Sequence, residues 1–190
     1  MEYVIIIISA VLVNNIVLSQ FLGICPFLGV SSRLSTAVGM GMAVIFVMTM
    51  ATIATYLVQH LVLVPLGLTF LQTVAFILII ASLVQLVEIV LKKVSPALYQ
   101  ALGVFLPLIT TNCAILGVAI LVVTRRYTLG EGVVFAIGSS IGFMFALYVF
   151  AGLRERMDLV DIPKAMKGAP IALVTAGLLA LAFGGFAGLV

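Results

Sequence analysis

The segment Phe21-Leu-Gly-Ile-Cys-Pro-Phe-Leu-Gly-Val-Ser31 places a cysteine and a proline between two glycines, inside a stretch that carries no charge from residue 3 to residue 32. As one straight helix this stretch would be about 45 Å long, which exceeds the roughly 30 Å hydrocarbon core of a bilayer. Proline removes a helix hydrogen bond, and glycine weakens a helix interior. The sequence therefore predicts a membrane helix that is interrupted close to the cysteine.

A second uncharged stretch, 94–124, contains a related motif. Its segment Cys113-Ala-Ile-Leu-Gly-Val118 has the same spacing of cysteine, leucine, glycine and valine as Cys25-Pro-Phe-Leu-Gly-Val30. The simplest account is a duplicated three-helix unit, with the first repeat at 1–91 and the second at 92–190. Because each unit has an odd number of spans, the second copy must enter the membrane inverted. Inverted repeats with interrupted helices point to a site near the bilayer midplane.

The composition of the whole chain agrees with a membrane location. The chain has 190 residues, of which 65% are hydrophobic and 8% are charged, and its mean hydropathy is +1.43. About a quarter of the residues of a soluble domain are charged, so this composition excludes a water-soluble enzyme. The net charge of +3 comes from basic residues scattered over short loops. Such scattering gives no basic patch, and we expect no nucleic-acid partner.

Polar and turn residues divide the chain into apolar segments that predict an all-α polytopic protein in the lipid bilayer. We expect six transmembrane helices in one integral membrane domain, arranged as two inverted-topology three-helix repeats with a discontinuous first helix in each. The segments run roughly over 3–31, 36–59, 70–91, 96–123, 132–153 and 168–190. The residues from His60 to Gly67 are expected to interrupt the second and third segments, and the polar stretch from Arg154 to Lys167 is expected to be a solvated loop.

The basic residues predict the orientation of the chain. Alternate loops hold seven lysines and arginines on one side and two on the other, which places the richer side in the cytoplasm and both termini outside. The N-terminus has no basic region before its apolar run, so this run is expected to be the first mature span. The richer side contains Arg33, Lys92, Lys93, Arg154, Arg156, Lys164 and Lys167, and the other side contains Arg125 and Arg126.

The two cysteines are the main candidates for chemistry, and three interpretations compete. Each cysteine can simply fill space in the core, the two can form a disulfide, or both can bind a metal. Their matching positions at two helix breaks favour metal binding. Two thiolates do not complete an iron–sulfur cluster, which usually takes four. A second chain with its own pair of cysteines would have to supply the rest.

Polar side chains next to both cysteines form a second group of candidates. Irregular backbone inside a membrane needs hydrogen-bond partners, and amide and hydroxyl groups can supply them. The same groups can donate to cluster sulfurs or offer oxygens to a passing cation. These residues are Asn14, Asn15, Thr110, Thr111 and Asn112.

Glu88 is the only carboxylate within an apolar segment, and two roles are open for it. An ionisable residue inside a membrane is a functional hypothesis, here cation transfer. However, Lys92 follows four residues later on the same helix face, so Glu88 can instead form an ion pair at the membrane interface.

The motifs resemble a known family over the whole chain. The segments Leu12-Val-Asn-Asn15, Phe21 to Ser31 and Leu106-Pro-Leu-Ile-Thr-Thr-Asn-Cys113 are similar to the small membrane subunits of the Rnf complexes and of the Na⁺-translocating NADH:quinone oxidoreductase. They most resemble the A-type subunits of Rnf. The equivalent quinone-reductase subunit usually has an acidic residue near the asparagine pair and no proline after the first cysteine.

This resemblance implies a role as an electron-relay subunit of an ion-translocating ferredoxin:NAD⁺ oxidoreductase in the bacterial inner membrane. It implies a homologous six-span partner of opposite orientation, the E-type subunit, and an intramembrane [2Fe–2S] cluster to which each chain gives two cysteines. The ligands here would be Cys25 and Cys113. It further implies contacts with other membrane and peripheral subunits, coupling to Na⁺ or H⁺, and no flavin, nucleotide or catalytic residue on this chain.

A small secondary transporter is the alternative function. In that case the asparagines and threonines beside the cysteines would form a polar substrate site near the midplane, and the cysteines would only pack.

Overall fold

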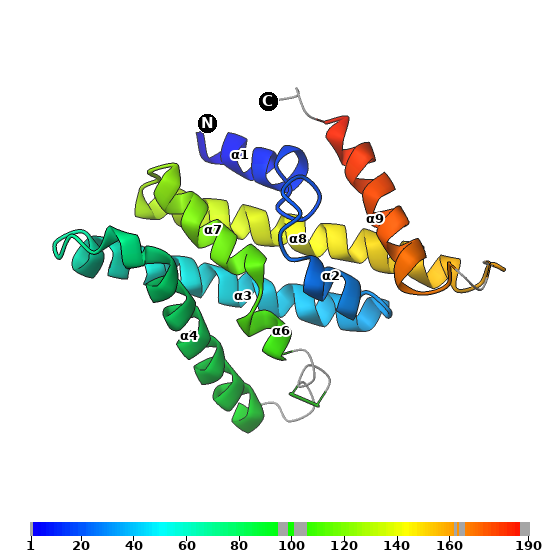
Figure 1. The fold of residues 1–190 in the computed structure, drawn as a ribbon, viewed down its shortest axis with the longest axis horizontal. Helices are drawn as coiled ribbons and strands as arrows, with labels where there is room; N and C mark the ends of the chain where they lie inside the picture. Colours follow the sequence, from blue (N-terminus) through cyan, green and yellow to red (C-terminus); the bar gives the residue numbers. More distant parts are fainter. Residues whose placement is uncertain (1, 95–98, 101–105, 162, 164–165, 187–190) are drawn as a thin grey trace.

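The computed structural model describes the chain except for residues 1, 95–98, 101–105, 162, 164–165 and 187–190, and its described regular structure is entirely helical (Figure 1). Helices labelled η have π or 3-10 geometry. In chain order the elements are α1 (Glu2–Ile8), η1 (Ser9–Val13), α2 (Ile24–Val30), α3 (Leu34–Val58), η2 (Gln59–Leu63), η3 (Thr69–Leu71), α4 (Gln72–Val94), α6 (Leu106–Thr110), α7 (Cys113–Thr124), α8 (Leu129–Met157) and α9 (Ala169–Gly184).

Four described helices are long and apolar enough to cross a membrane. They are Leu34–Leu63, Thr69–Val90, Pro107–Thr124 and Leu129–Met157. The first and sixth predicted segments contain shorter apolar helices, Tyr3–Val13 and Ala169–Gly184. The expected membrane character is therefore confirmed. Six complete spans and the division into repeats at 1–91 and 92–190 stay predictions.

Helix α8 lies at the centre of the bundle and packs most extensively on α3 (Figure 1). Met48 of α3 and Phe143 and Leu147 of α8 are completely buried. These side chains are apolar on both helices, so the contact between α3 and α8 forms the core of the molecule.

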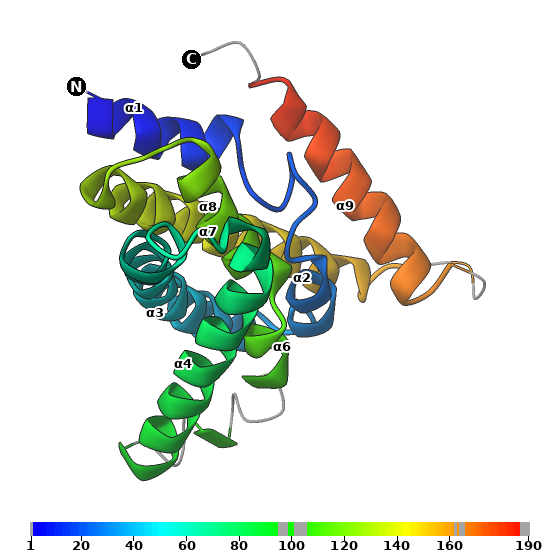
Figure 2. The same ribbon diagram turned by 60° about the vertical axis from the view of Figure 1, so that its left-hand side comes forward.

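Helices α4 and α9 diverge from this bundle, on opposite sides (Figure 2). Only 17% of the apolar part of the span Thr69–Val90, which contains most of α4, is buried. Leu78 on α4 and Leu181 on α9 are large apolar side chains that remain mostly exposed. Apolar faces of this kind suit contact with lipid chains or with another membrane protein.

The predicted interruption of the first segment is present. Helical structure stops after Val13, and the chain is irregular over residues 14–23 before α2 begins. The fully buried Asn15 supports this irregular backbone, because its Nδ2 donates to the Gly142 carbonyl at 2.8 Å and its Oδ1 accepts from the Val17 N–H at 3.1 Å. The amide thus satisfies the polar groups that the break exposes.

A second break separates α6 from α7 at Thr111 and Asn112. The Asn112 side chain caps α7, since its Oδ1 accepts from the Ala114 N–H at 3.0 Å. Both cysteine motifs therefore follow a helix break, as predicted, while much of the fourth segment before residue 106 lies outside the described residues.

Two predicted boundaries are wrong. The second span does not end before His60, because a π-helical turn, closed by the Val64 N–H donating to the Gln59 carbonyl at 3.0 Å, continues it to Leu63. Helix α8 also continues through the charged residues after 153, to Met157. Charged side chains extend into water from the end of a helix, so the end of an apolar run does not mark the end of the helix.

Candidate cysteine site at the two helix breaks

The first cysteine lies in the opening turn of α2. Cys25 is exposed, and α2 follows Gly23, whose φ of +81° lies in the left-handed region. A Cβ on Gly23 would approach the Phe143 ring to 2.8 Å and Ala114 Cβ to 3.0 Å. Glycine is required here both for the backbone conformation and for the close approach of the chain to α7 and α8.

The second cysteine contacts the first break directly. Cys113 is the first residue of α7 and is partly exposed. The Gly23 N–H donates a hydrogen bond to Cys113 Sγ at 2.9 Å, across 90 positions of sequence. The backbone two residues before Cys25 is therefore bound to the other cysteine, so the fold brings the two motifs together.

Asn112 adds an unused hydrogen-bond donor beside Cys113. The residue is 3% exposed, and its Nδ2 has no hydrogen-bond partner in the part of the chain that the structure describes. A buried donor without a partner is unfavourable unless something absent from the isolated chain accepts from it.

The donor set fits half of an iron–sulfur site. Both cysteines are free thiols, which does not support the disulfide interpretation, and both reach the surface of the chain. Among the described residues no group of three or more His, Cys, Asp or Glu side chains could hold a metal. Two accessible thiols with nearby N–H donors suit a cluster that takes its other two ligands from a second chain.

Comparison with known proteins identifies the family. A family model described as "Rnf-Nqr subunit, membrane protein" matches residues 3–190. The chain belongs to the Rnf-Nqr family. This match covers essentially the whole chain, and it confirms the family that the two cysteine motifs indicate.

Curated relatives of the Rnf-Nqr chain are named as A-type subunits. This chain is 61% identical to the A-type subunit of the ion-translocating oxidoreductase complex of Syntrophotalea carbinolica, over 97% of this chain and 96% of the relative. It is 59% identical to the A-type subunit of the Na(+)-translocating ferredoxin:NAD(+) oxidoreductase complex of Acetobacterium woodii, over 100% and 98%. The corresponding chain of the ion-translocating oxidoreductase complex of Erwinia tasmaniensis is 56% identical, again over 100% and 98%.

The other predicted polar residues have local partners in this Rnf-Nqr chain. Asn14 Nδ2 donates to Ser9 Oγ at 3.0 Å, and the exposed Thr111 donates to the Pro107 carbonyl at 3.0 Å. Thr110 is half-buried on α6. The structure thus uses several of these groups to support the breaks themselves.

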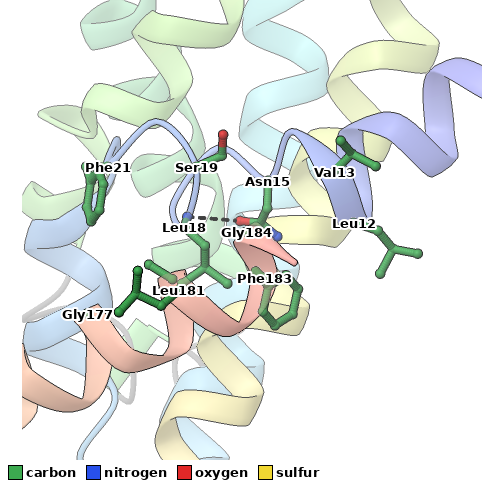
Figure 3. Close-up of a pocket in the computed structure, with 11 residues that line it drawn as sticks. Leu12, Val13, Asn15, Leu18, Ser19, Phe21, Gly177, Leu181, Phe183 and Gly184 are labelled. Atoms are coloured by element: carbon green, nitrogen blue, oxygen red, sulfur yellow. Dashed lines mark hydrogen bonds between the residues drawn. The ribbon is translucent and has the colours of Figure 1, made fainter. Parts of the chain in front are cut away.

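A cavity of about 320 Å³ lies between the irregular segment and α9, and Figure 3 shows side chains from both around it. Its walls are mainly apolar, and its polar side chains are Asn15 and Ser19. Asn14, Thr110, Thr111 and Asn112 do not line it, so this cavity does not gather the polar site that the transporter alternative requires. The wall residues are Leu12, Val13, Asn15, Leu18, Ser19, Phe21, Gly177, Ala180, Leu181, Phe183 and Gly184.

Glu88 lies on α4 and contacts an aromatic residue. Its Oε1 accepts from the Tyr99 hydroxyl at 3.5 Å, and the Lys92 ammonium lies 5.7 Å from the centroid of the Tyr99 ring. Glu88 and Lys92 therefore both approach Tyr99.

The end of α8 supports the cysteine site through contacts that the sequence did not predict. Arg154 Nη1 donates to the Leu28 carbonyl at 2.7 Å and to Ser31 Oγ at 2.8 Å, both at the end of α2. The Phe27 and Phe150 rings stack at 4.3 Å between the same helices. Arg154 was expected in a solvated loop, and its position directly after an apolar run was the only signal of a contact.

Proposed function

We propose that this chain is the A-type subunit of an ion-translocating ferredoxin:NAD⁺ oxidoreductase complex in the bacterial inner membrane. In this proposal Cys25 and Cys113 provide two of the four ligands of a [2Fe–2S] cluster, and a homologous E-type subunit of opposite orientation provides the other two. The proposal is supported by the names of the relatives, which describe A-type subunits of ion-translocating oxidoreductases.

The hydrogen bond from the Gly23 N–H to Cys113 Sγ is the observation that carries the ligand assignment. It holds the two cysteine motifs next to each other although they lie in opposite halves of the sequence. Hydrogen bonds to the ligand sulfurs are among the features that set the reduction potential of an iron–sulfur cluster, so this N–H suits a sulfur that binds iron.

The residues of this chain position the two sulfurs and satisfy the backbone around them. Gly23 and Asn112 hold the starts of α2 and α7, and Asn112 Nδ2 is available to donate to a cluster sulfur. The cluster, when bound, supplies one-electron transfer at a depth where a single step across the roughly 30 Å apolar core would be too slow. This step is coupled in the complex to movement of Na⁺ or H⁺.

The test is iron analysis and electron paramagnetic resonance of the whole purified complex. Cys25→Ser and Cys113→Ser should each remove the reduced [2Fe–2S] signal and lower the iron content, because an alcohol replaces a thiolate ligand. The matched control is Thr124→Val, since this exposed side chain at the far end of α7 bonds only to its own helix in the described structure.

Retention of the signal in either cysteine variant would refute the ligand assignment. The E-type partner must still copurify with each variant, so that loss of iron is separated from loss of assembly. Uptake of a solute by the isolated chain in liposomes would instead support the transporter alternative.

A further inference from the structure

A second cavity, which is separate from the cysteine site, lies where three candidate membrane spans end. The spans Leu34–Leu63 and Pro107–Thr124 end beside it, and the span Leu129–Met157 begins beside it. The cavity has a volume of about 320 Å³. Because three spans reach their limit at this level, the cavity opens at a boundary between hydrocarbon and water.

Gln59 gives this cavity a polar group without a partner. The residue lines the cavity and is 5% exposed, and its Oε1 has no hydrogen-bond partner in the described part of the chain. A buried acceptor without a donor is unfavourable, so the position suits a ligand that brings an N–H or O–H group. Val122 and Tyr56 provide apolar walls around it.

Arg126 gives the cavity a positive charge at a backbone position where arginine is unusual. The Tyr127 N–H donates to the Val122 carbonyl and the Arg126 N–H to the Val123 carbonyl, both at 3.1 Å, which ends α7 in a Schellman motif. The left-handed residue of this motif is usually glycine, yet here it is Arg126, with φ +54°.

The two neighbouring arginines differ in their contacts. Arg125 Nη1 donates to the Tyr127 hydroxyl at 3.3 Å, and its guanidinium lies 5.4 Å from the Phe135 ring centroid. Within the described residues, the Arg126 guanidinium has no comparable hydrogen bond, ion pair or ring contact. Arg126 lines the cavity and Arg125 does not. The described part of the chain therefore keeps a strained, unpaired cation beside an unpaired acceptor.

We propose that this cavity binds the head group of a phospholipid that carries a hydrogen-bond donor, either an ethanolamine ammonium or a glycerol hydroxyl. The lipid phosphate pairs with Arg126, and the donor of the head group bonds to Gln59 Oε1. Arg126 and Gln59 Oε1 together fit such a head group, because its phosphate and its hydrogen-bond donor belong to one molecule. A choline head group has no N–H or O–H to offer.

The experiment uses the whole complex in nanodiscs that contain a photoactivatable phosphatidylethanolamine, phosphatidylglycerol or phosphatidylcholine. Cross-linking is quantified by mass spectrometry on the peptides that contain Gln59 and Arg126. We expect about tenfold more labelling by ethanolamine or glycerol lipid than by choline lipid, which is the change expected from one hydrogen bond to a charged or strong donor. The comparison of the first two lipids identifies the head group.

Two variants test the site without weakening the fold. Gln59→Leu removes the unpaired acceptor and Arg126→Gly relieves the left-handed conformation, so neither should lower the melting temperature. Gln59→Leu should abolish the preference over choline lipid, and Arg126→Gly should reduce labelling by the preferred lipid about tenfold. Arg125→Gln removes the same charge one residue away and should leave labelling unchanged.

The proposal is overturned by equal labelling with all three lipids, or by equal loss in the Arg125 and Arg126 variants. Displacement of the lipid by inorganic phosphate would also overturn it, because the site would then bind a free anion.

Discussion

At the scale of single residues, Gly23 links the conformation of the first break to the second cysteine. Its N–H donates to Cys113, its φ is +81°, and no side chain fits between it and Phe143. The left-handed φ and the close approach to Phe143 depend on the absence of a Cβ atom. Gly23 thus positions a proposed ligand although it is not itself one.

Gly23→Ala should lower stability and disturb the cysteine site. The left-handed conformation costs a residue with a Cβ about 1–2 kcal/mol, and the approach to the Phe143 ring adds to this cost. We expect a lower melting temperature of the complex, together with a changed or weakened paramagnetic signal.

Gly29→Ala is the matched control for this prediction. Gly29 lies within α2, and a Cβ there would meet Leu108 at 3.6 Å, an ordinary contact. Alanine favours a helix over glycine, so this variant should be as stable as the original chain or slightly more so. Equal effects of the two substitutions would contradict the role given to Gly23.

The cysteines and the asparagines of the site could be predicted from sequence, whereas Gly23 and Arg154 could not. A repeated Cys-x-x-Leu-Gly-Val pattern marks the two motifs, and amide side chains beside a helix break are expected to satisfy backbone. The bond from Gly23 to Cys113 depends instead on how distant helices pack. The position of Arg154 directly after an apolar run indicates a contact, but it does not indicate that the partner is α2.

At the scale of elements, the end of α8 contacts two other helices. Arg154 bonds to the last turn of α2 through Leu28 and Ser31. The next residue, Glu155, accepts from the Leu34 N–H at 2.9 Å, at the start of α3. A carboxylate is favourable at a helix N-terminus and a guanidinium at a C-terminus, so this charge order suits both helices.

Arg154→Gln should loosen α2 without removing a proposed ligand. Arg154 is only half-buried, so the loss of its two hydrogen bonds is expected to cost about 1–2 kcal/mol. Hydrogen exchange measured by mass spectrometry should become faster over α2.

Arg156→Gln is the control for this variant, because Arg156 is exposed in the same turn of α8 and its substitution removes the same charge. It should leave exchange in α2 unchanged. If the Arg154 variant exchanged no faster than this control, the assigned contact would not hold α2 in solution.

Helix boundaries were less predictable than helix positions, for a physical reason. An apolar run records the part of a helix that avoids water, whereas the helix itself ends where its capping groups lie. Helix α8 begins with a capping box, in which Thr128 and Glu131 bond to each other's backbone, and it continues beyond the end of its apolar run at Leu153 to Met157. The capping residues are visible in the sequence, but the length of an apolar run does not record them.

At the scale of the whole molecule, the described loops lie at two opposite ends of α8. Val64 and Thr128 line one cavity, so the end of η2 and the start of α8 lie on the same side. Arg154 bonds to Ser31 at the other end of α8. A helix of 29 residues separates these ends by about 43 Å, enough to place them on opposite sides of a bilayer. This arrangement agrees with the alternation of loops on which the predicted orientation depends.

The count of basic residues then predicts which side is cytoplasmic, and cysteine labelling in intact cells can check it. Leu66 is 64% exposed beside η2, and Leu159 is 88% exposed after α8. Because the sequence assigns seven of the nine basic residues to the loops predicted on the side of Arg154, that side should face the cytoplasm. Leu66→Cys should therefore react with a membrane-impermeant maleimide in intact cells, and Leu159→Cys should react only after permeabilisation. The chain without either substitution measures labelling of Cys25 and Cys113. The reverse pattern would show that the partner subunits, rather than this chain's own charges, determine its orientation.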